Sequence, residues 1–448
     1  MNRQLSEIDP QTAWQPYRPS AENPWSTRLA AHLLRRAAFG GTITEISRAE
    51  SAGPSETLDR LFDLEAAADF EKEMATAGRL VSSGADSRAL SAWWLLRMVQ
   101  TPVPLQEKMT LFWHGHFATG GDKVNDSRAM LRQNNLLRDH CLTEFQPLVR
   151  EISCDVATLI YLDSEDNRKT RPNENYAREL MELFCLGPGN YTEQDIKEIA
   201  RCFTGWEVRR GRFNFNPYQH DEGTKAFLGA SGDFDGNDAV GIVLEQPAAA
   251  RFIARKLIRF FVFDDLEISD ELAEPVAVRL RETSFNIGSA LRMILESELF
   301  FSEHAIGHKI KSPVELAVGF LHFFNATTNM QQLSDRLAGL GQLPLYPPNV
   351  KGWDGGKTWI NASTVLARAN LINELANNAT FADGSLSQWA SSNGMSESDG
   401  VEMAEEFLLA TPMPEETRRK ISGELRSNDV QSARLIALVG ALPEFQLN

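Results

Sequence analysis

The sequence predicts a mainly α-helical protein, built as a large multi-helix domain with a short β-hairpin and glycine-rich loop insertions. Apolar residues recur at helical spacing along most of the 448 residues, whereas strand-like alternation is confined to 207–218. The hydrophobic share of 42% and the charged share of 24% are typical of globular proteins, and the length is enough for one to three domains.

Turn or polar residues separate most of the expected helices. The sequence Gly187-Pro188-Gly189 ends the helix at 173–186, because glycine accepts a left-handed cap and proline cannot continue a helix. Thr192, followed by Asp195, caps the next helix. The remaining helices are expected at 25–38, 57–64, 70–81, 90–100, 105–113, 127–143, 145–162, 247–263, 270–282, 287–295, 314–324 and 333–340, with another opening at Asn361.

Changes in composition along the chain divide it into three parts. We expect a polar N-terminal arm at 1–25, a main α-helical domain at 26–380 and a small helical C-terminal appendage at 381–448. The main domain carries an irregular or β insertion at about 207–246 and a loop rich in Gly, Pro and Trp at 343–360. No repeat of fixed period is visible.

Charge narrows the range of partners. The chain has 45 Lys and Arg against 61 Asp and Glu, a formal net charge of −16. A nucleic-acid groove and an anionic membrane surface both require positive surface, so we expect no nucleic-acid partner. No run of about 18 apolar residues occurs, which predicts no membrane span, and no nucleotide-binding motif is present because 351–357 lacks the Walker spacing.

The start of the chain and its cysteines indicate a compartment. The first 25 residues lack an apolar segment of the signal-peptide type, so the sequence as it stands predicts a cytoplasmic protein. Export would require that the N-terminus has been trimmed. The four cysteines form no Cys-x-x-Cys pair, which favours buried free thiols in a reducing cytoplasm.

Two histidines close the apolar helix at 105–113. His114 and His116 can point to the same side if the chain is extended there, and Gly115 permits a turn out of the helix. The pair is therefore a candidate for metal ligation. The alternative is that the rings bind the last carbonyls of the helix and favour the negative end of its dipole.

The helix at 173–186 gathers polar side chains on one arc of about 140°, namely Glu174, Asn175, Arg178, Glu179 and Glu182. As a solvent face, this arc would hold ion pairs worth about 0.3–0.5 kcal/mol each. As a site, Glu179 and Glu182 would offer two carboxylates to a metal or act as a general acid and base. Arg178 would then hold one carboxylate ionised, and Asn175 would orient a ligand.

Two loops carry further candidates. His220 and Asp221 could form a metal ligand with a neighbouring carboxylate, and Lys225 is a binding candidate, although a charged turn explains the segment almost as well. Trp353 could stack on a sugar ring, or it could be buried against its own loop.

Six separated motifs together resemble the large bacterial family catalogued as Domain of Unknown Function 1800. They are Leu34-Arg35-Arg36-Ala37-Ala38-Phe39-Gly40, Phe112-Trp113-His114-Gly115-His116-Phe117, residues 173–187, residues 191–206, His220-Asp221 with Lys225, and Pro347-Pro348-Asn349-Val350-Lys351-Gly352-Trp353. The resemblance runs from about residue 26 onward. It implies a mostly α-helical fold without an established activity, often encoded beside a second family that resembles sulfatases and alkaline phosphatases. Many members of the family are exported.

These observations lead to one main hypothesis and two alternatives. The main one is a divalent-metal site for hydrolytic or oxidative chemistry, with the imidazoles and one carboxylate as ligands, the other carboxylate as general base, and Arg178 orienting an anionic group. The first alternative is a non-catalytic helical scaffold that acts with a sulfatase-like partner or an extracellular polymer. The second is a sugar-processing enzyme with paired carboxylates and a stacking Trp353.

Overall fold

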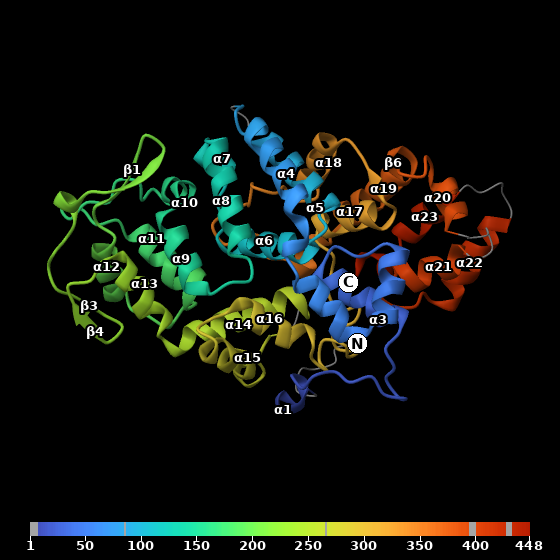
Figure 1. The fold of residues 1–448 in the computed structure, drawn as a ribbon, viewed down its shortest axis with the longest axis horizontal. Helices are drawn as coiled ribbons and strands as arrows, with labels where there is room; N and C mark the ends of the chain where they lie inside the picture. The colour runs from blue at the N-terminus through green and yellow to red at the C-terminus, as the bar shows by residue number, and fades with distance from the viewer. Residues whose placement is uncertain (1–7, 85–86, 265–266, 394–399, 427–431) are drawn as a thin grey trace.

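A computed structural model of the chain describes residues 8–84, 87–264, 267–393, 400–426 and 432–448. Helices dominate these residues, and the strands among them form small two-stranded antiparallel sheets. The predicted mainly α fold class is therefore confirmed. In Figure 1 the sheets β1–β2 and β3–β4 lie with α10–α13 at one end of an elongated molecule, and α19–α23 lie at the other end.

The helices begin and end at the following residues. In the first half they are α1 (Pro10–Ala13), α2 (Thr27–Ala37), α3 (Ile43–Phe62), α4 (Ala68–Val81), α5 (Arg88–Gln100), α6 (Pro104–His116), α7 (Gly121–Val124), α8 (Ser127–Asp139), α9 (Phe145–Cys154), α10 (Val156–Tyr161), α11 (Glu174–Glu179) and α12 (Glu193–Cys202). In the second half they are α13 (Gly236–Leu244), α14 (Pro247–Phe261), α15 (Asp270–Glu282), α16 (Ile287–Leu295), α17 (Pro313–Phe323), α18 (Met330–Gly339), α19 (Ala362–Asn378), α20 (Leu386–Ser392), α21 (Gly400–Met403), α22 (Glu415–Arg426) and α23 (Ser432–Gly440). Two π-helical segments, Leu180–Cys185 and Ala404–Leu408, continue α11 and α21.

Local signals placed several boundaries correctly. The hairpin expected at 207–218 is β1 (Trp206–Arg209) paired with β2 (Arg212–Phe215), with Trp206 opposite Phe215. Thr192 forms a capping box with Asp195 at the start of α12, and Gly187 is left-handed at the end of the π-helical segment, with φ of 79°. The other strand pairs are β3 (Lys225–Phe227) with β4 (Ala230–Gly232), and β5 (Ala326–Thr327) with β6 (Thr380–Phe381).

Other boundaries differ from expectation for physical reasons. The expected helix at 145–162 is two helices, because Asp155 accepts the N–H of Thr158 and starts α10. The insertion expected to be irregular or β at about 207–246 becomes helical from Gly236, where Asp235 caps α13. The expected helix at 57–64 is the end of α3, whose capping box begins at Thr42.

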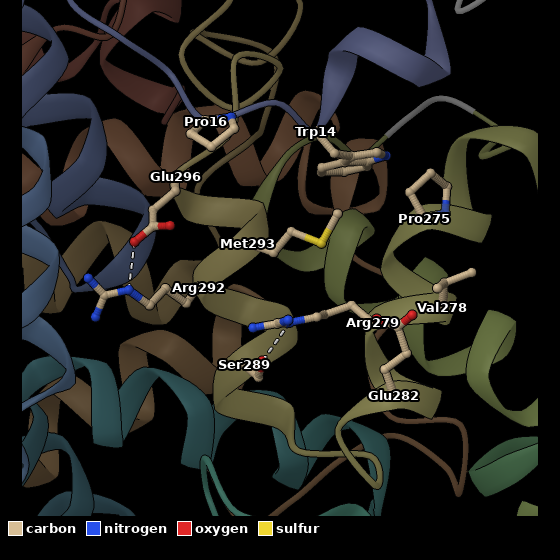
Figure 2. Close-up of a pocket in the computed structure, with 10 residues that line it drawn as sticks. All are labelled: Trp14, Pro16, Pro275, Val278, Arg279, Glu282, Ser289, Arg292, Met293 and Glu296. Atoms are coloured by element: carbon tan, nitrogen blue, oxygen red, sulfur yellow. Dashed lines mark hydrogen bonds and ion pairs between the residues drawn. The ribbon is translucent and has the colours of Figure 1, made fainter.

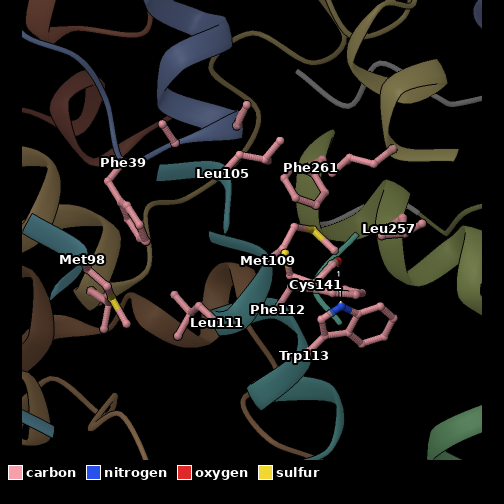
Figure 3. Packing of buried hydrophobic residues seen from close by; sticks show 14 of the residues in the cluster. Phe39, Met98, Leu105, Met109, Leu111, Phe112, Trp113, Cys141, Leu257 and Phe261 are labelled. Carbon is pink, nitrogen blue, oxygen red and sulfur yellow. Dashed lines mark hydrogen bonds between the residues drawn. The ribbon is translucent and has the colours of Figure 1, made fainter. Parts of the chain in front are cut away.

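Helix α6 runs through the middle of the core. Its buried residues include charged Glu107 and Lys108 as well as its apolar side chains. Figure 3 shows Met109 and Phe112 of α6 meeting Leu257 and Phe261 of α14. A helix that is buried on all sides holds its C-terminal end deep in the protein.

Two further expectations concern the chain as a whole. In the parts of the chain that the structure describes, no helix combines the length and apolar character needed to cross a membrane. All four cysteines carry free thiols, and Cys141, Cys185 and Cys202 are buried while Cys154 is half-buried.

Candidate functional site

The C-terminal end of α6 forms hydrogen bonds with two segments, the loop at 343–360 and the π-helical segment. The backbone N–H of Leu345, in the loop at 343–360, donates to His114 Nε2 over 3.0 Å. His116 Nε2 donates to the carbonyl of Phe184, in the π-helical segment, also over 3.0 Å. Gly352 lies so close that a Cβ there would be 2.2 Å from the carbonyl oxygen of Gly115. Three of the six motifs that carry the family resemblance therefore meet at one helix end.

The two histidines do not point to the same side. Because α6 remains helical through His116, residues two apart lie roughly 200° apart around its axis, and the rings bind different segments. Their bonds fix opposite tautomers: His114 accepts at Nε2 and carries its proton on Nδ1, while His116 carries its proton on Nε2. Burial lowers the pKa of His114 to about 3. Burial and the charge of Lys256 lower the pKa of His116 well below its ordinary value, so both rings are neutral at pH 7.

The carboxylates of the second motif do lie together. Glu179 ends α11 and Glu182 lies in the π-helical segment one turn later. The half-buried Glu179 carboxyl makes no hydrogen bond or ion pair with any described residue, whereas Glu182 Oε2 accepts the hydroxyl of Tyr191 over 3.1 Å. Burial and the charge of Glu182 raise the pKa of Glu179 above its ordinary value, although Arg178 and Lys351 oppose this rise.

Tyr191 adds a weak proton donor beside the pair. Burial, together with its bond to Glu182, raises the pKa of Tyr191 to about 12. Its hydroxyl therefore stays protonated and donates to Glu182 across the whole range in which proteins fold.

The π-helical segment gives this pair an uncommon backbone. The N–H groups of Leu186 and Gly187 both donate to the carbonyl of Met181, over 2.9 and 3.0 Å. π-Helical turns are rare and occur frequently at functional sites. The bond from His116 satisfies the Phe184 carbonyl, which lies too near the end of the helix to find a partner within it.

Arg178 and Asn175 make their hydrogen bonds with residues other than Glu179 and Glu182. Arg178 makes a bidentate contact with Glu193 at the start of α12, with both distances 2.9 Å, and lies 3.5 Å from Glu174. It binds Glu193 rather than Glu182 because α12 packs beside α11. Asn175 is exposed and donates weakly to the carbonyl of Leu162 over 3.4 Å.

The third motif forms a network of its own near the small sheets. His220 Nδ1 donates to the carbonyl of Thr204 over 2.8 Å. Asp221 accepts two bonds from Arg201, 2.7 and 3.2 Å long, and these lower the pKa of Asp221. The buried Lys225 donates to Asp233 over 2.9 Å. These contacts link His220, Asp221 and Lys225 to neighbours within the same end of the molecule.

Metal ligation requires several donor atoms around a common centre. Within the ranges that the structure describes, no group of three or more His, Cys, Asp and Glu side chains is arranged to hold a metal ion. The expected ligands His114, His116, His220 and Asp221 are not brought together as such a group. The two carboxylates Glu179 and Glu182 do lie together.

The loop at 343–360 places an aromatic ring and a cation beside α6. Trp353 is half-buried and meets the ring of His114 edge-on at 5.6 Å between centroids. Its Nε1 is buried and has no hydrogen-bond partner among the described residues. Lys351, two residues earlier, is exposed and acts electrostatically on Glu179.

Sequence reasoning missed Lys256 and Tyr191 and did not assign a role to Lys351. Lys256 lies over the ring of Phe252 at 5.1 Å on α14, and no carboxylate among the described residues contacts it. Burial and the nearby Arg259 lower the pKa of Lys256 to about 8. Nothing in the sequence marks this lysine among the other cations of α14.

A surface pocket lies apart from this site. It has a volume of about 490 Å³ and lies between α15, α16 and the N-terminal arm (Figure 2). Its arginines are engaged, since Arg279 donates to Ser289 and Arg292 donates to Glu296. None of the site residues expected from the sequence lines it.

Comparison with known proteins agrees with the motifs. The profile of a family described as Protein of unknown function (DUF1800) matches residues 32–447. No curated protein and no solved structure shows a significant match to this chain. The match covers nearly the whole sequence, and the chain therefore belongs to the DUF1800 family.

Proposed function

We propose that this protein is a hydrolytic enzyme that uses Glu179 and Glu182 as a general acid and base. The observation that carries the proposal is the half-buried Glu179 carboxyl, which has a raised pKa and no hydrogen-bond partner among the described residues. A carboxyl whose pKa moves toward the working pH can hold a proton and release it during a reaction. A purely structural acid would be expected to pair with Arg178, which binds Glu193 instead.

Each neighbour has a role in this proposal. Glu179 gives its proton to the leaving oxygen as the scissile bond breaks. Glu182, oriented by the Tyr191 hydroxyl, takes the proton from the attacking water. Lys351 supplies positive charge beside the pair and favours a substrate or transition state that bears negative charge.

The test compares three variants on chromogenic esters, phosphate esters and glycosides. Glu179→Gln should lower kcat/KM by about 10²–10⁴ on the substrate class that is hydrolysed, and Glu182→Gln should lower it similarly. Glu174→Gln is the matched control, because Glu174 lies one turn before Arg178 on the exposed side of the same helix. Turnover that survives Glu179→Gln, or no turnover of any class by the intact protein, contradicts the proposal.

A second candidate is a divalent cation bound by the same two carboxylates. It is favoured by the like charge of Glu182 close to Glu179, since two neighbouring carboxylates offer the oxygen ligands that Mg²⁺, Ca²⁺ and Mn²⁺ prefer. The histidines would then support the backbone rather than ligate. Elemental analysis and thermal melts with each cation test this version. It predicts that the cation raises Tm for the intact protein and that Glu179→Gln abolishes this rise. The double variant His114→Ala/His116→Ala should keep the rise, because the histidines are not ligands in this version.

The scaffold alternative makes opposite predictions. A non-catalytic protein that acts with a sulfatase-like partner would show no turnover, and Glu179→Gln would leave the thermal melt intact while a co-purified partner is lost. The activity screen and a pull-down with the same variants separate the two.

A further inference from the structure

A second set of buried charged residues includes Lys108, in the N-terminal half of α6. It contains six cations, contributed by α2, α6, the segment before α17, and α19: Arg35, Arg36, Lys108, Lys309, Lys311 and Arg368. Among the described residues, only Glu315 and Asp264 form ion pairs with them. A buried excess of positive charge is costly unless an anion compensates it.

The Arg35 guanidinium has no anionic partner among the described residues. Its Nε and Nη2 are both buried and have no hydrogen-bond partner among the described residues. These two N–H groups lie side by side and form the fork with which arginine binds a carboxylate or phosphate in a bidentate manner. Burial, with the charges of Arg36 and Arg28, lowers the pKa of Arg35 to about 9. Arg36 also leaves Nε and Nη1 without partners.

A small cavity lies beside the Arg35 side chain. Its volume of about 40 Å³ is enough for a small group of atoms. Arg35 and Lys311 line it, and its remaining wall is mostly apolar and includes five phenylalanines: Phe39, Phe320, Phe323, Phe407 and Phe445.

The one carboxylate at the cavity is already engaged. Glu315 binds Lys108 through Oε1 and accepts the N–H of Ser312 at Oε2 over 2.8 Å. Lys311 Nζ donates to the carbonyl of Phe445 over 2.7 Å. Burial, with the charges of Arg35 and Arg368, lowers the pKa of Lys311 well below its ordinary value, and an anion bound beside it would favour its charged form.

We propose that this cavity binds a small oxyanion, with Arg35 as its bidentate partner and Lys311 as a second cation. The ligand is either a free inorganic oxyanion, such as phosphate or sulfate, or the carboxylate of a small organic acid whose apolar part contacts the phenylalanine wall. The proposal is independent of Glu179 and Glu182, because no residue is shared between the two sites.

The test measures thermal melting at constant ionic strength, with chloride replaced by phosphate, sulfate or acetate. A saturable rise in Tm of about 2 °C or more is expected for the intact protein with at least one oxyanion. Arg35→Gln and Lys311→Gln should remove most of this rise. Arg419→Gln is the control, because it removes the same charge from an exposed site on α22.

The pattern of responses decides the outcome. A response to phosphate or sulfate assigns a free inorganic ion, and a response to acetate alone assigns an organic acid. Equal melting in chloride and all oxyanions, or a rise that Arg35→Gln and Lys311→Gln retain, overturns the proposal. If Arg35→Gln fails to fold, equilibrium dialysis of labelled phosphate, sulfate and acetate against the intact protein and Lys311→Gln gives the same decision.

Discussion

Replacement of Glu107 by Gln should destabilise the protein by about 3 kcal/mol at pH 7. Glu107 is fully buried on α6 and binds Arg97 and Arg138 over 2.5 Å each, while Trp94 Nε1 donates to it over 2.7 Å. Burial alone would raise its pKa, but the two arginines outweigh burial and lower it from 4.5 to about 2. At about 1.4 kcal/mol for each pKa unit, this lowering corresponds to roughly 3 kcal/mol. Breaking a buried ion pair typically costs about 3–5 kcal/mol.

The magnitude can be checked by urea unfolding followed by circular dichroism. The lowered pKa means that the stabilisation is present above about pH 4.5 and is lost as the pH falls toward 2. The difference between wild type and Glu107→Gln should therefore shrink in acid. Glu56→Gln is the control, because its ion pair with Arg60 is exposed and worth at most about 1 kcal/mol. A difference below about 1 kcal/mol at pH 7, or one that does not depend on pH, would refute the reasoning.

Two further predictions concern stability. Gly352→Ala should destabilise the protein by at least about 2 kcal/mol in urea unfolding, because Gly352 has φ of 77° and a Cβ would meet the carbonyl oxygen of Gly115. The second concerns His322, where burial acts to lower the pKa but the hydrogen bond and charge of Glu45 outweigh it and raise the pKa. The resulting stabilisation is present below about pH 6.5 and is lost as the pH rises through the raised pKa, so the advantage of wild type over His322→Gln should decline from pH 6 to pH 9 in the same assay.

Both predictions have controls in the chain. Gly339→Ala, at the end of α18, adds a methyl group with no atom within 4 Å and should be nearly neutral. His304→Gln replaces a histidine outside the His322–Glu45 pair and controls for the loss of an imidazole as such. A neutral Gly352→Ala would contradict the close contact at Gly115. An advantage of wild type over His322→Gln that grows with pH would contradict the assigned sign.

Local sequence was sufficient where a boundary depends on neighbouring residues. The capping box of Thr192 and the left-handed Gly187 are set by side chains within a few positions, and both were predicted. The fold class follows from helical periodicity along the chain for the same reason.

The arrangement of the site depended on contacts between distant residues. His114 and His116 look like a ligand pair only if the chain leaves the helix, and the bonds to Leu345 and Phe184 involve segments that the sequence does not place beside them. Arg178 has Glu174 and Glu182 one turn away on either side, yet its shorter ion pair is with Glu193 of α12, which the sequence does not place beside it. Periodicity also cannot reveal that α6 buries charge, because a buried ion network looks like a break in an apolar face.

The two histidine bonds at the end of α6 give the proposed active site an unusual folding requirement. One bond joins His116 to Phe184, which is 68 positions away in the sequence, and the other joins His114 to Leu345, which is 231 positions away. Lys351 and Glu182 can therefore take up their relative positions only after most of the chain has folded around α6. The proposed activity would therefore appear late in folding and in a single step. A fragment that lacks α6, the π-helical segment or the loop at 343–360 should not regain it.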